Sequence, residues 1–183
     1  MADVTVHPIG AVALQADCSQ CAGLCCVALA FDKSDMFAFD KPAGRPCRNL
    51  TPACKCSIHD QLEPDGFAGC VRYDCGGAGQ RVTQTIFKGA SWQSDPALLG
   101  PMMEAFRTMR SVHENIILLR AAKSLPLDKN QRSALAAFEQ DMHPHAGWDV
   151  TNLSGFEQSD ITKRIQKFLR GLRDVAGLRS TPD

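Results

Sequence analysis

The sequence predicts an α+β fold, in which an irregular cysteine-rich lobe with short strands precedes a small bundle of about three helices. All nine cysteines of the 183-residue chain lie between Cys18 and Cys75, where short apolar segments are separated by Gly, Pro and Asp. After Trp92 the apolar residues recur at spacings of three and four, the period of an amphipathic helix. The expected organisation is a flexible lead-in over 1–16, a cysteine-rich lobe over 17–90 and a helical lobe over 91–183.

The cysteine-rich lobe has no helix-length apolar pattern. A short strand over 4–7 would end at Pro8, and the apolar segments 27–31 and 36–39 are brief and interrupted. Such a stretch buries little apolar area by itself. We therefore expect bound metal to hold this lobe together.

The first helix of the helical lobe has a clear start and end. Asp95 is an N-cap residue with Pro96 at the first helical position, and Pro126 terminates the helix. Its apolar residues at helical spacing are Leu98, Leu99, Met102, Met103, Phe106, Met109, Val112, Ile116, Ile117 and Leu119.

Two further helices complete the predicted bundle. Asp128 can cap a helix that runs to about Met142, and Ser159 or Asp160 can begin the next. The residues expected to face inward are Leu135, Phe138 and Met142 in one, and Ile161, Ile165, Phe168, Leu169 and Leu172 in the other.

Charge is balanced over the whole chain, with 20 basic and 20 acidic residues. No overall field attracts nucleic acid or an anionic membrane, so we expect neither as a partner. No apolar stretch approaches the roughly 20 residues of a membrane span. The last predicted helix is nevertheless basic, and this face is either solvated or a docking surface for an acidic protein partner. Its charged residues are Lys163, Arg164, Lys167, Arg170 and Arg173, with Arg179 beyond it.

The N-terminal residues indicate which compartment the cysteines occupy. Asp3 precedes any basic residue and the apolar run 9–14 is short, whereas a secretory signal has a basic start and a longer apolar centre. A cytoplasmic location follows, in which clustered cysteines more often bind metal than form disulfides. An odd number of cysteines also leaves one unpaired in any scheme based only on disulfides.

The first cysteines have the spacing of a metal site. Cys18 and Cys21 are separated by two residues, so both sulfurs can face one metal ion, and Gly23 lets the chain turn back toward Cys25. Cys25 and Cys26 would point apart in an extended chain and could then serve different centres.

The remaining cysteines form two further groups, which are Cys47, Cys54 and Cys56, and then Cys70 and Cys75. Cys54 and Cys56 would share one face of a strand, and His59 is a candidate ligand or hydrogen-bond partner of a sulfur. The glycines 76, 77 and 79 lack the pattern of a nucleotide-binding loop and predict a tight turn. Nothing in the sequence places a base and an orienting acid beside a cysteine nucleophile, so no catalytic residue is assigned.

These motifs resemble the YkgJ-type cysteine-cluster family, described as zinc- or iron-chelating. The resemblance rests on the opening Cys-x2-Cys-x3-Cys-Cys, on Cys47, on 56–59, and on the trailing Cys70 and Cys75. It is closer to the cysteine-rich N-terminal region of bacterial pentapeptide-repeat proteins, over 24–29, 39–44, 46–50, 66–70, 73–75 and 77–80. The cluster is also similar to one in flagellin lysine methylases, thought to hold an iron–sulfur cluster, but no methyl-donor motif is visible.

The resemblance implies a set of eight metal ligands. These are Cys18, Cys21, Cys25, Cys26, Cys47, Cys56, Cys70 and Cys75. Cys54 has no counterpart and is read as a spare thiol. Two functions stay open: a binding or adaptor module built on two tetrahedral zinc sites, which we favour, and an iron–sulfur protein that transfers electrons or supports a modification reaction.

Overall fold

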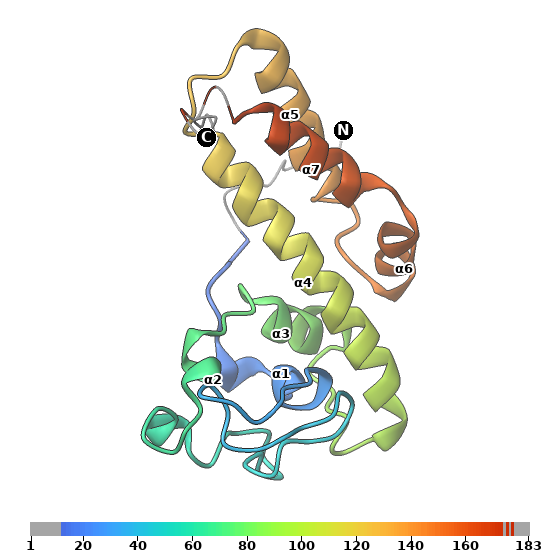
Figure 1. Cartoon of the computed structure of the whole chain (residues 1–183). Coiled ribbons are helices and arrows are strands. Elements are labelled where there is room, and N and C mark those ends of the chain that lie inside the picture. Colours follow the sequence, from blue (N-terminus) through green and yellow to red (C-terminus); the bar gives the residue numbers. More distant parts are fainter. Residues whose placement is uncertain (1–11, 174, 176, 178–183) are drawn as a thin grey trace.

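The protein is described by a computed structural model that covers residues 12–173, 175 and 177. Within this part of the chain, loops connect seven α-helices (Figure 1). Their bounds are α1 Leu24–Ala28, α2 Ala68–Arg72, α3 Ala78–Gln80, α4 Leu99–Ala122, α5 Lys129–Asp141, α6 Val150–Gln158 and α7 Ile161–Gly171. Helix α3 continues directly into a π-helical segment, Arg81–Ile86.

The prediction of an α+β fold was wrong. The described residues contain no strand and no sheet, and three isolated bridges are the nearest approach to one: Phe31 with Lys41, Ser34 with Phe37, and Leu50 with Cys56. Segment 27–31 begins inside α1, and Cys54 has a left-handed φ of 59° that no strand accommodates. A pair of residues without neighbours to extend it cannot form a ladder. The strand predicted over 4–7 lies outside the described residues.

Helix α4 begins at Leu99, three residues after the predicted start at Pro96, and ends before the predicted terminator Pro126. The Asp95 side chain accepts a hydrogen bond from the amide of Ala97 across a 3-10 turn that starts at Pro96, and α4 follows directly. It ends at Ala122, four residues before Pro126. Ile117 is the exception among its predicted inward residues, because 42% of it is exposed.

The second half of the chain contains one helix more than predicted. Helix α5 starts at the predicted cap, where Asp128 and Gln131 form a capping box, and α7 starts directly after Asp160. Helix α6 was missed, although Asp149 and Asn152 form a second capping box at its start. Its sequence is short and contains a glycine, so its apolar pattern is weak.

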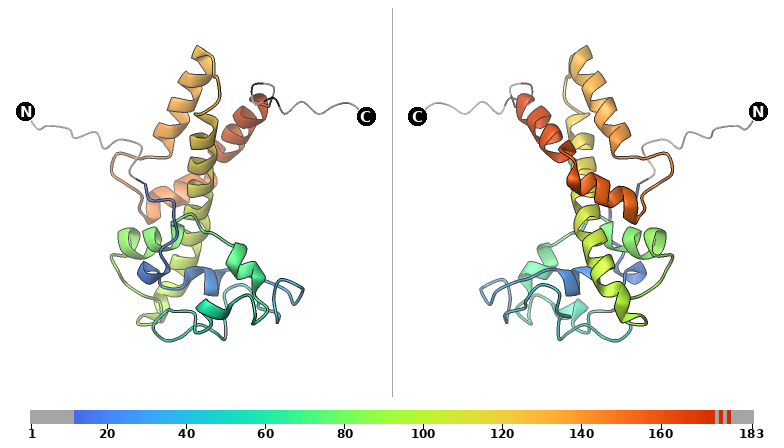
Figure 2. Two further views of the ribbon diagram at one scale, coloured as in Figure 1. Left: turned by 90° about the vertical axis from the view of Figure 1, so that its left-hand side faces the viewer. Right: turned by 90° about the vertical axis from the view of Figure 1, so that its right-hand side faces the viewer.

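Helix α4 is the centre of the molecule. It contacts α1 and α3 in its first part and α5, α6 and α7 further along, and the views agree that the cysteine-rich loops surround one end of it (Figures 1 and 2). One continuous cluster of buried side chains joins Leu24 and Val27 of α1 to Leu153 of α6 and Ile165 of α7. The buried core therefore crosses the boundary expected near residue 90. No helix in the described part has the length and hydropathy needed to span a bilayer.

A matched pair of adjacent leucines on α4 tests this core. Leu119 is 1% exposed and Leu118 is 47% exposed. Leu119→Ala should lower the free energy of unfolding by about 2–5 kcal/mol, because it leaves a cavity, whereas Leu118→Ala should change it little. Chemical denaturation measures both. Equal losses would contradict the packing described for α4.

Candidate metal centre

The first cysteines are positioned by two tight turns and by α1. Cys18 opens a 3-10 turn capped by the Asp17 carboxylate, which accepts a hydrogen bond from the Ser19 amide at 2.9 Å. Gly23, with a left-handed φ of 67°, then starts α1, which carries Cys25. A Cβ atom at Gly23 would lie 2.8 Å from a methyl carbon of Leu50, so both the turn and the space require glycine.

The backbone beside Cys21 is fixed from both sides. The amide of Ala22 donates to the Thr83 hydroxyl at 3.1 Å, and the carbonyl of Ala22 accepts from the Trp92 indole at 2.8 Å. Thr83 belongs to the π-helical segment after α3 and itself donates to the Gly79 carbonyl. Cys21 is therefore held against α3 by hydrogen bonds that do not involve its sulfur.

Four of the predicted ligands line one small cavity. This first cysteine group consists of Cys18, Cys21, Cys25 and Cys75. The cavity has a volume of about 20 Å³, enough for one water-sized particle, and it is closed by Phe106 of α4. A Cβ atom at Gly79 would lie 2.7 Å from the Cys21 sulfur, so only glycine at this position leaves room for the thiol.

The other four predicted ligands are Cys26, Cys47, Cys56 and Cys70, all free thiols, and we call them the second cysteine group. The Cys47 amide donates to the Cys26 carbonyl at 2.9 Å. Burial, followed by the charges of Cys25, Cys47 and Cys56, raises the pKa of the Cys70 thiol to about 11. These neighbours come from α1, the loop over 47–56 and α2.

Cys25 and Cys26 connect the two groups. Their sulfurs are 3.9 Å apart, and the contact with Cys26, together with burial, raises the pKa of Cys25 well above its ordinary value. The sequence predicted that Cys25 and Cys26 would point apart if the chain were extended at this position. Both instead lie in α1, which is helical rather than extended.

Cys54 and His59 belong to neither group. The Cys54 sulfur lies 3.4 Å from the Ser91 hydroxyl. The His59 side chain is 64% exposed and faces Asp60 at 3.4 Å. The hydrogen-bond partner of His59 is thus a carboxylate rather than a sulfur, and the interpretation of Cys54 as a spare thiol stays a prediction.

The thiols are neighbours rather than a finished coordination site. Among the described residues, no three Cys, His, Asp or Glu side chains already form a group that could hold a metal ion. Burial is the main cause that raises the pKa of Cys21 to about 11 and raises the pKa of Cys18 and Cys56 as well. These side chains are therefore protonated thiols near neutral pH, and a metal ion would have to displace their protons.

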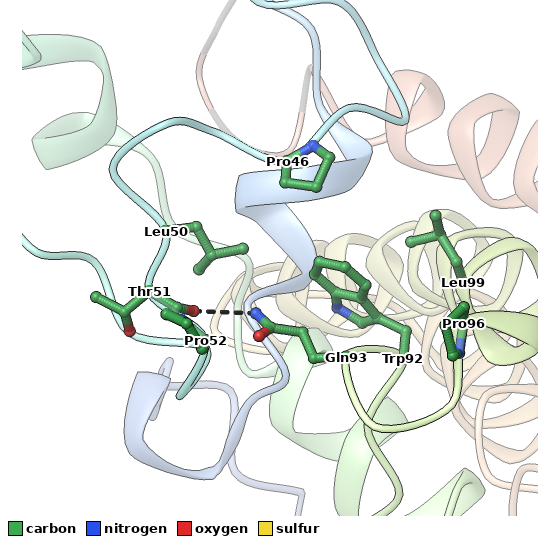
Figure 3. A pocket seen from close by; sticks show the side chains of 8 residues that line it. All are labelled: Pro46, Leu50, Thr51, Pro52, Trp92, Gln93, Pro96 and Leu99. Atoms are coloured by element: carbon green, nitrogen blue, oxygen red, sulfur yellow. Dashed lines mark hydrogen bonds between the residues drawn. The ribbon is translucent and has the colours of Figure 1, made fainter.

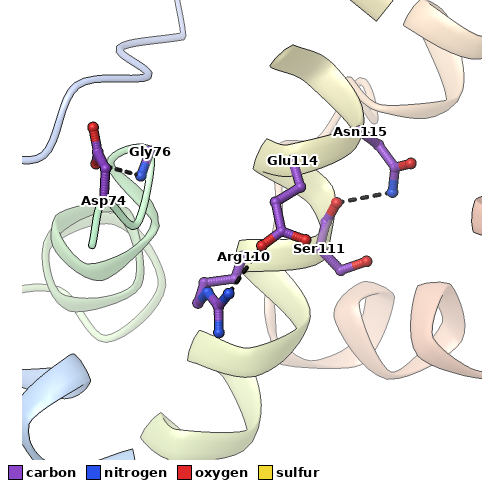
Figure 4. A network of polar contacts seen from close by, with 6 residues as sticks. All are labelled: Asp74, Gly76, Arg110, Ser111, Glu114 and Asn115. Carbon is purple, nitrogen blue, oxygen red and sulfur yellow. Dashed lines mark hydrogen bonds and ion pairs between the residues drawn. The ribbon is translucent and has the colours of Figure 1, made fainter. Parts of the chain in front are cut away.

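Helix α4 holds the loop that carries Cys75. The Asp74 carboxylate accepts a hydrogen bond from the Gly76 amide at 2.7 Å, and Arg110 pairs with Glu114 at 2.9 Å on the facing side of α4 (Figure 4). The Arg110 guanidinium also lies 5.3 Å from the centre of the Tyr73 ring. Asn115, further along the same helix, donates to the Ser111 carbonyl at 2.8 Å (Figure 4).

His113 provides the buried link between α4 and this loop. It is fully buried, its Nδ1–H donates to the Gly76 carbonyl, and its Nε2 accepts a hydrogen bond from Arg81 at 3.1 Å. This arrangement fits only the neutral ring, and burial lowers the pKa of His113 to about 4. The contact of His113 with the cysteine-rich loop joins residues 37 positions apart and has no local signal in the sequence.

A second pocket is lined by no cysteine. It has a volume of about 370 Å³ and its lining is mostly apolar (Figure 3). Gln93 donates to the Thr51 carbonyl at 3.0 Å across it. No cysteine, histidine, acidic or basic residue lines it, so it offers no group for acid–base or metal chemistry. Its lining residues are Pro46, Leu50, Thr51, Pro52, Trp92, Gln93, Pro96 and Leu99.

Comparison with known proteins gives similarity without an assigned function. The chain is 45% identical over 134 residues to the uncharacterized protein YybG of Bacillus subtilis strain 168. The match covers 73% of this chain and 48% of that protein, so the chain spans about half the length of the relative. No family model and no solved structure matches. The resemblance to YkgJ-type proteins therefore stays a prediction.

His113 makes the stability of the fold depend on pH. The pKa of His113 in the folded chain, about 4, lies below its ordinary value of 6.5. Between these two values of pH, the histidine binds a proton in the unfolded chain but not in the folded chain. Its contribution is present above pH 6.5 and is lost as the pH falls toward 4, a loss of roughly 3 kcal/mol. His113→Gln should flatten this dependence.

Denaturation of both proteins at several values of pH measures the effect. His145→Gln is the control, because His145 is exposed in the loop before α6. An unchanged slope in His113→Gln would show that the imidazole at position 113 is not the group responsible.

Proposed function

We propose that this chain is a metal-binding protein whose eight clustered cysteines form two four-thiolate sites, with zinc as the favoured ion. The observation that carries the proposal is the set of four cysteines that line one small cavity. The remaining four predicted ligands would form the second site. Four cysteine sulfurs are the ligand set of a closed tetrahedral zinc site. Such a site would serve structure and binding rather than catalysis, because no coordination position is left for a substrate.

The small volume of the cavity at the first cysteine group favours a single metal ion over a cluster. A space of about 20 Å³ suits one atom-sized occupant and is small for a cubane of four irons and four sulfides. The glycine at position 79 keeps the space beside Cys21 free. Metal binding would draw the four sulfurs inward around the ion.

An unpaired buried donor beside the first group fits the same proposal. The Tyr73 hydroxyl is buried and has no hydrogen-bond partner among the described residues. The charges that act on it include those of Cys25 and Cys75. A buried hydroxyl without a partner is costly, and a metal-bound thiolate nearby would supply an acceptor.

The loops of the second group need cohesion that their packing does not supply. Over residues 31–67, Phe67 is the sole buried apolar side chain. It joins a small cluster of aromatic rings with Phe31 and Phe39, and Phe37 stacks on Phe31 at 4.3 Å. Ligation of Cys47, Cys56 and Cys70 would tie these loops to α1, where Cys26 lies.

The proposed compartment follows from the free thiols, and the proposed partner follows from the basic face of α7. Nine free thiols suit a reducing compartment, and we propose the cytoplasm. The solvent face of α7 carries exposed Lys163, Lys167 and Arg170, which suits an acidic protein partner. The chain would then act as a binding or adaptor module that presents this helix on a metal-stabilised scaffold.

Substitution of single cysteines should separate the two sites. Cys21→Ala and Cys47→Ala should each retain about one zinc ion per chain, because each removes a ligand from a different group. Cys54→Ala is the matched control and should retain about two. Zinc content by elemental analysis measures all three. Equal loss in the three variants would contradict both the grouping and the spare role of Cys54.

The identity of the metal is tested on protein purified without oxygen. It should be colourless and contain about two zinc ions per chain. A brown protein with stoichiometric acid-labile sulfide would contradict the zinc proposal and support an iron–sulfur centre. A chain without bound metal, and without affinity for added zinc, would contradict metal binding altogether.

A further inference from the structure

Lys41 is a buried lysine whose charge has no evident counterpart. It is 4% exposed, although lysine side chains normally extend their ammonium group into water. Its ammonium donates to the carbonyls of Val27 at 3.2 Å, Leu29, and Pro42 at 3.3 Å. These contacts satisfy its three donors with neutral acceptors. No carboxylate in the described part of the chain forms an ion pair with it.

The backbone holds Lys41 firmly in this position. Its amide and carbonyl are both hydrogen-bonded to Phe31, at 2.7 and 3.0 Å. The ammonium lies 5.7 Å from the centre of the Phe31 ring, a second favourable but neutral contact. The residue is thus fixed at the end of α1, where its charge cannot reach solvent by a simple side-chain rotation.

The ammonium lies beside the backbone of the second cysteine group, because the Val27 carbonyl that it binds follows Cys26, and the Cys26 carbonyl accepts a hydrogen bond from the Cys47 amide at 2.9 Å. The thiol groups whose charges act on the Lys41 ammonium are, in decreasing order, Cys47, Cys26, Cys25 and Cys70. Three of these four belong to the second group. A thiol that carries its proton offers an ammonium no compensating charge, and a buried unpaired cation destabilises a folded chain.

Metal ligation would reverse this situation. A divalent ion bound by four thiolates leaves a net double negative charge on the centre, and a fixed ammonium beside it offsets part of that charge. Lysine thereby favours the metal-bound thiolates over the protonated thiols. The first cysteine group has no equivalent, because its neighbour Lys55 is exposed and binds the carbonyls of Cys18 and Ser19.

From these contacts, and resting on the proposed metal-binding function, we infer that Lys41 is the charge-compensating residue of the second site. The inference makes that site an all-thiolate anionic centre that depends on a buried ammonium. The first site depends on it less, because Cys25 is the one member of that group among the thiols that interact with Lys41.

The test substitutes Lys41 while one metal site at a time is kept. In Cys21→Ala, which retains the second site, adding Lys41→Met should weaken zinc binding roughly ten- to a hundredfold. In Cys47→Ala, which retains the first site, the same change should weaken zinc binding much less, because Cys25 is the one ligand of that site that interacts with Lys41. Competition with a coloured zinc chelator measures both, and Lys33→Met is the control because Lys33 is exposed in the same loop.

A stability measurement distinguishes this role from simple packing. Without metal, Lys41→Met should change the midpoint of denaturation less than it does with zinc, because removal of a buried unpaired charge partly offsets the loss of the hydrogen bonds to three carbonyls. With zinc, the same substitution should lower the midpoint. Equal destabilisation in both states, or equal weakening of both sites, would overturn the inference and leave the metal-binding proposal intact. Failure of the Lys41-containing chain to bind zinc would instead overturn the metal-binding proposal itself.

Discussion

Helix α4 buries Met102, Phe106 and Met109 completely, and the contact of this face with α1 and α3 fixes the positions of the cysteines. Because α1 carries Cys25 and Cys26, its packing sets where both cysteine groups meet. Phe106 itself closes the cavity of the first group. The hydrophobic core therefore determines the distances between thiols, even though no thiol is needed to form that core.

The remaining cysteines depend on weaker forces. The loops over residues 31–67 are connected by isolated bridges, a few aromatic contacts and single hydrogen bonds. A segment with little buried apolar surface is expected to open more readily than the helices around it. Metal ligation and the Lys41 charge would act on this segment, which is where a modest gain in free energy changes the structure most.

Several residues outside the cysteine motifs define the surroundings of the thiols. His113 and Arg81 fix the loop of Cys75 from α4 and from the π-helical segment, and Thr83 fixes the backbone next to Cys21. A π-helical segment is uncommon and is often found at functional sites. Here it places Arg81 beside His113 of α4, and Thr83 beside the backbone of Ala22, which precedes α1.

The sequence by itself determined the helices with strong caps and periodic apolar residues, because these signals are local. Asp95, Pro96 and Asp128 mark helix starts through contacts with residues close in the chain. The concentration of cysteines between Cys18 and Cys75 likewise indicated the region of interest without any structure. The same local reasoning failed for short apolar segments, where strand and loop differ only in whether a partner strand exists.

Tertiary structure alone decided how the thiols are grouped. Spacing suggested that Cys18 and Cys21 act together, but it could not add Cys75, which reaches their cavity because His113 binds the carbonyl of Gly76. Lys41 was likewise indistinguishable from a surface lysine in the sequence, since its burial depends on carbonyls from α1 and the residues that follow it. Contacts between residues far apart in the chain have no local signal, and they set both the burial and the charge around the cysteines.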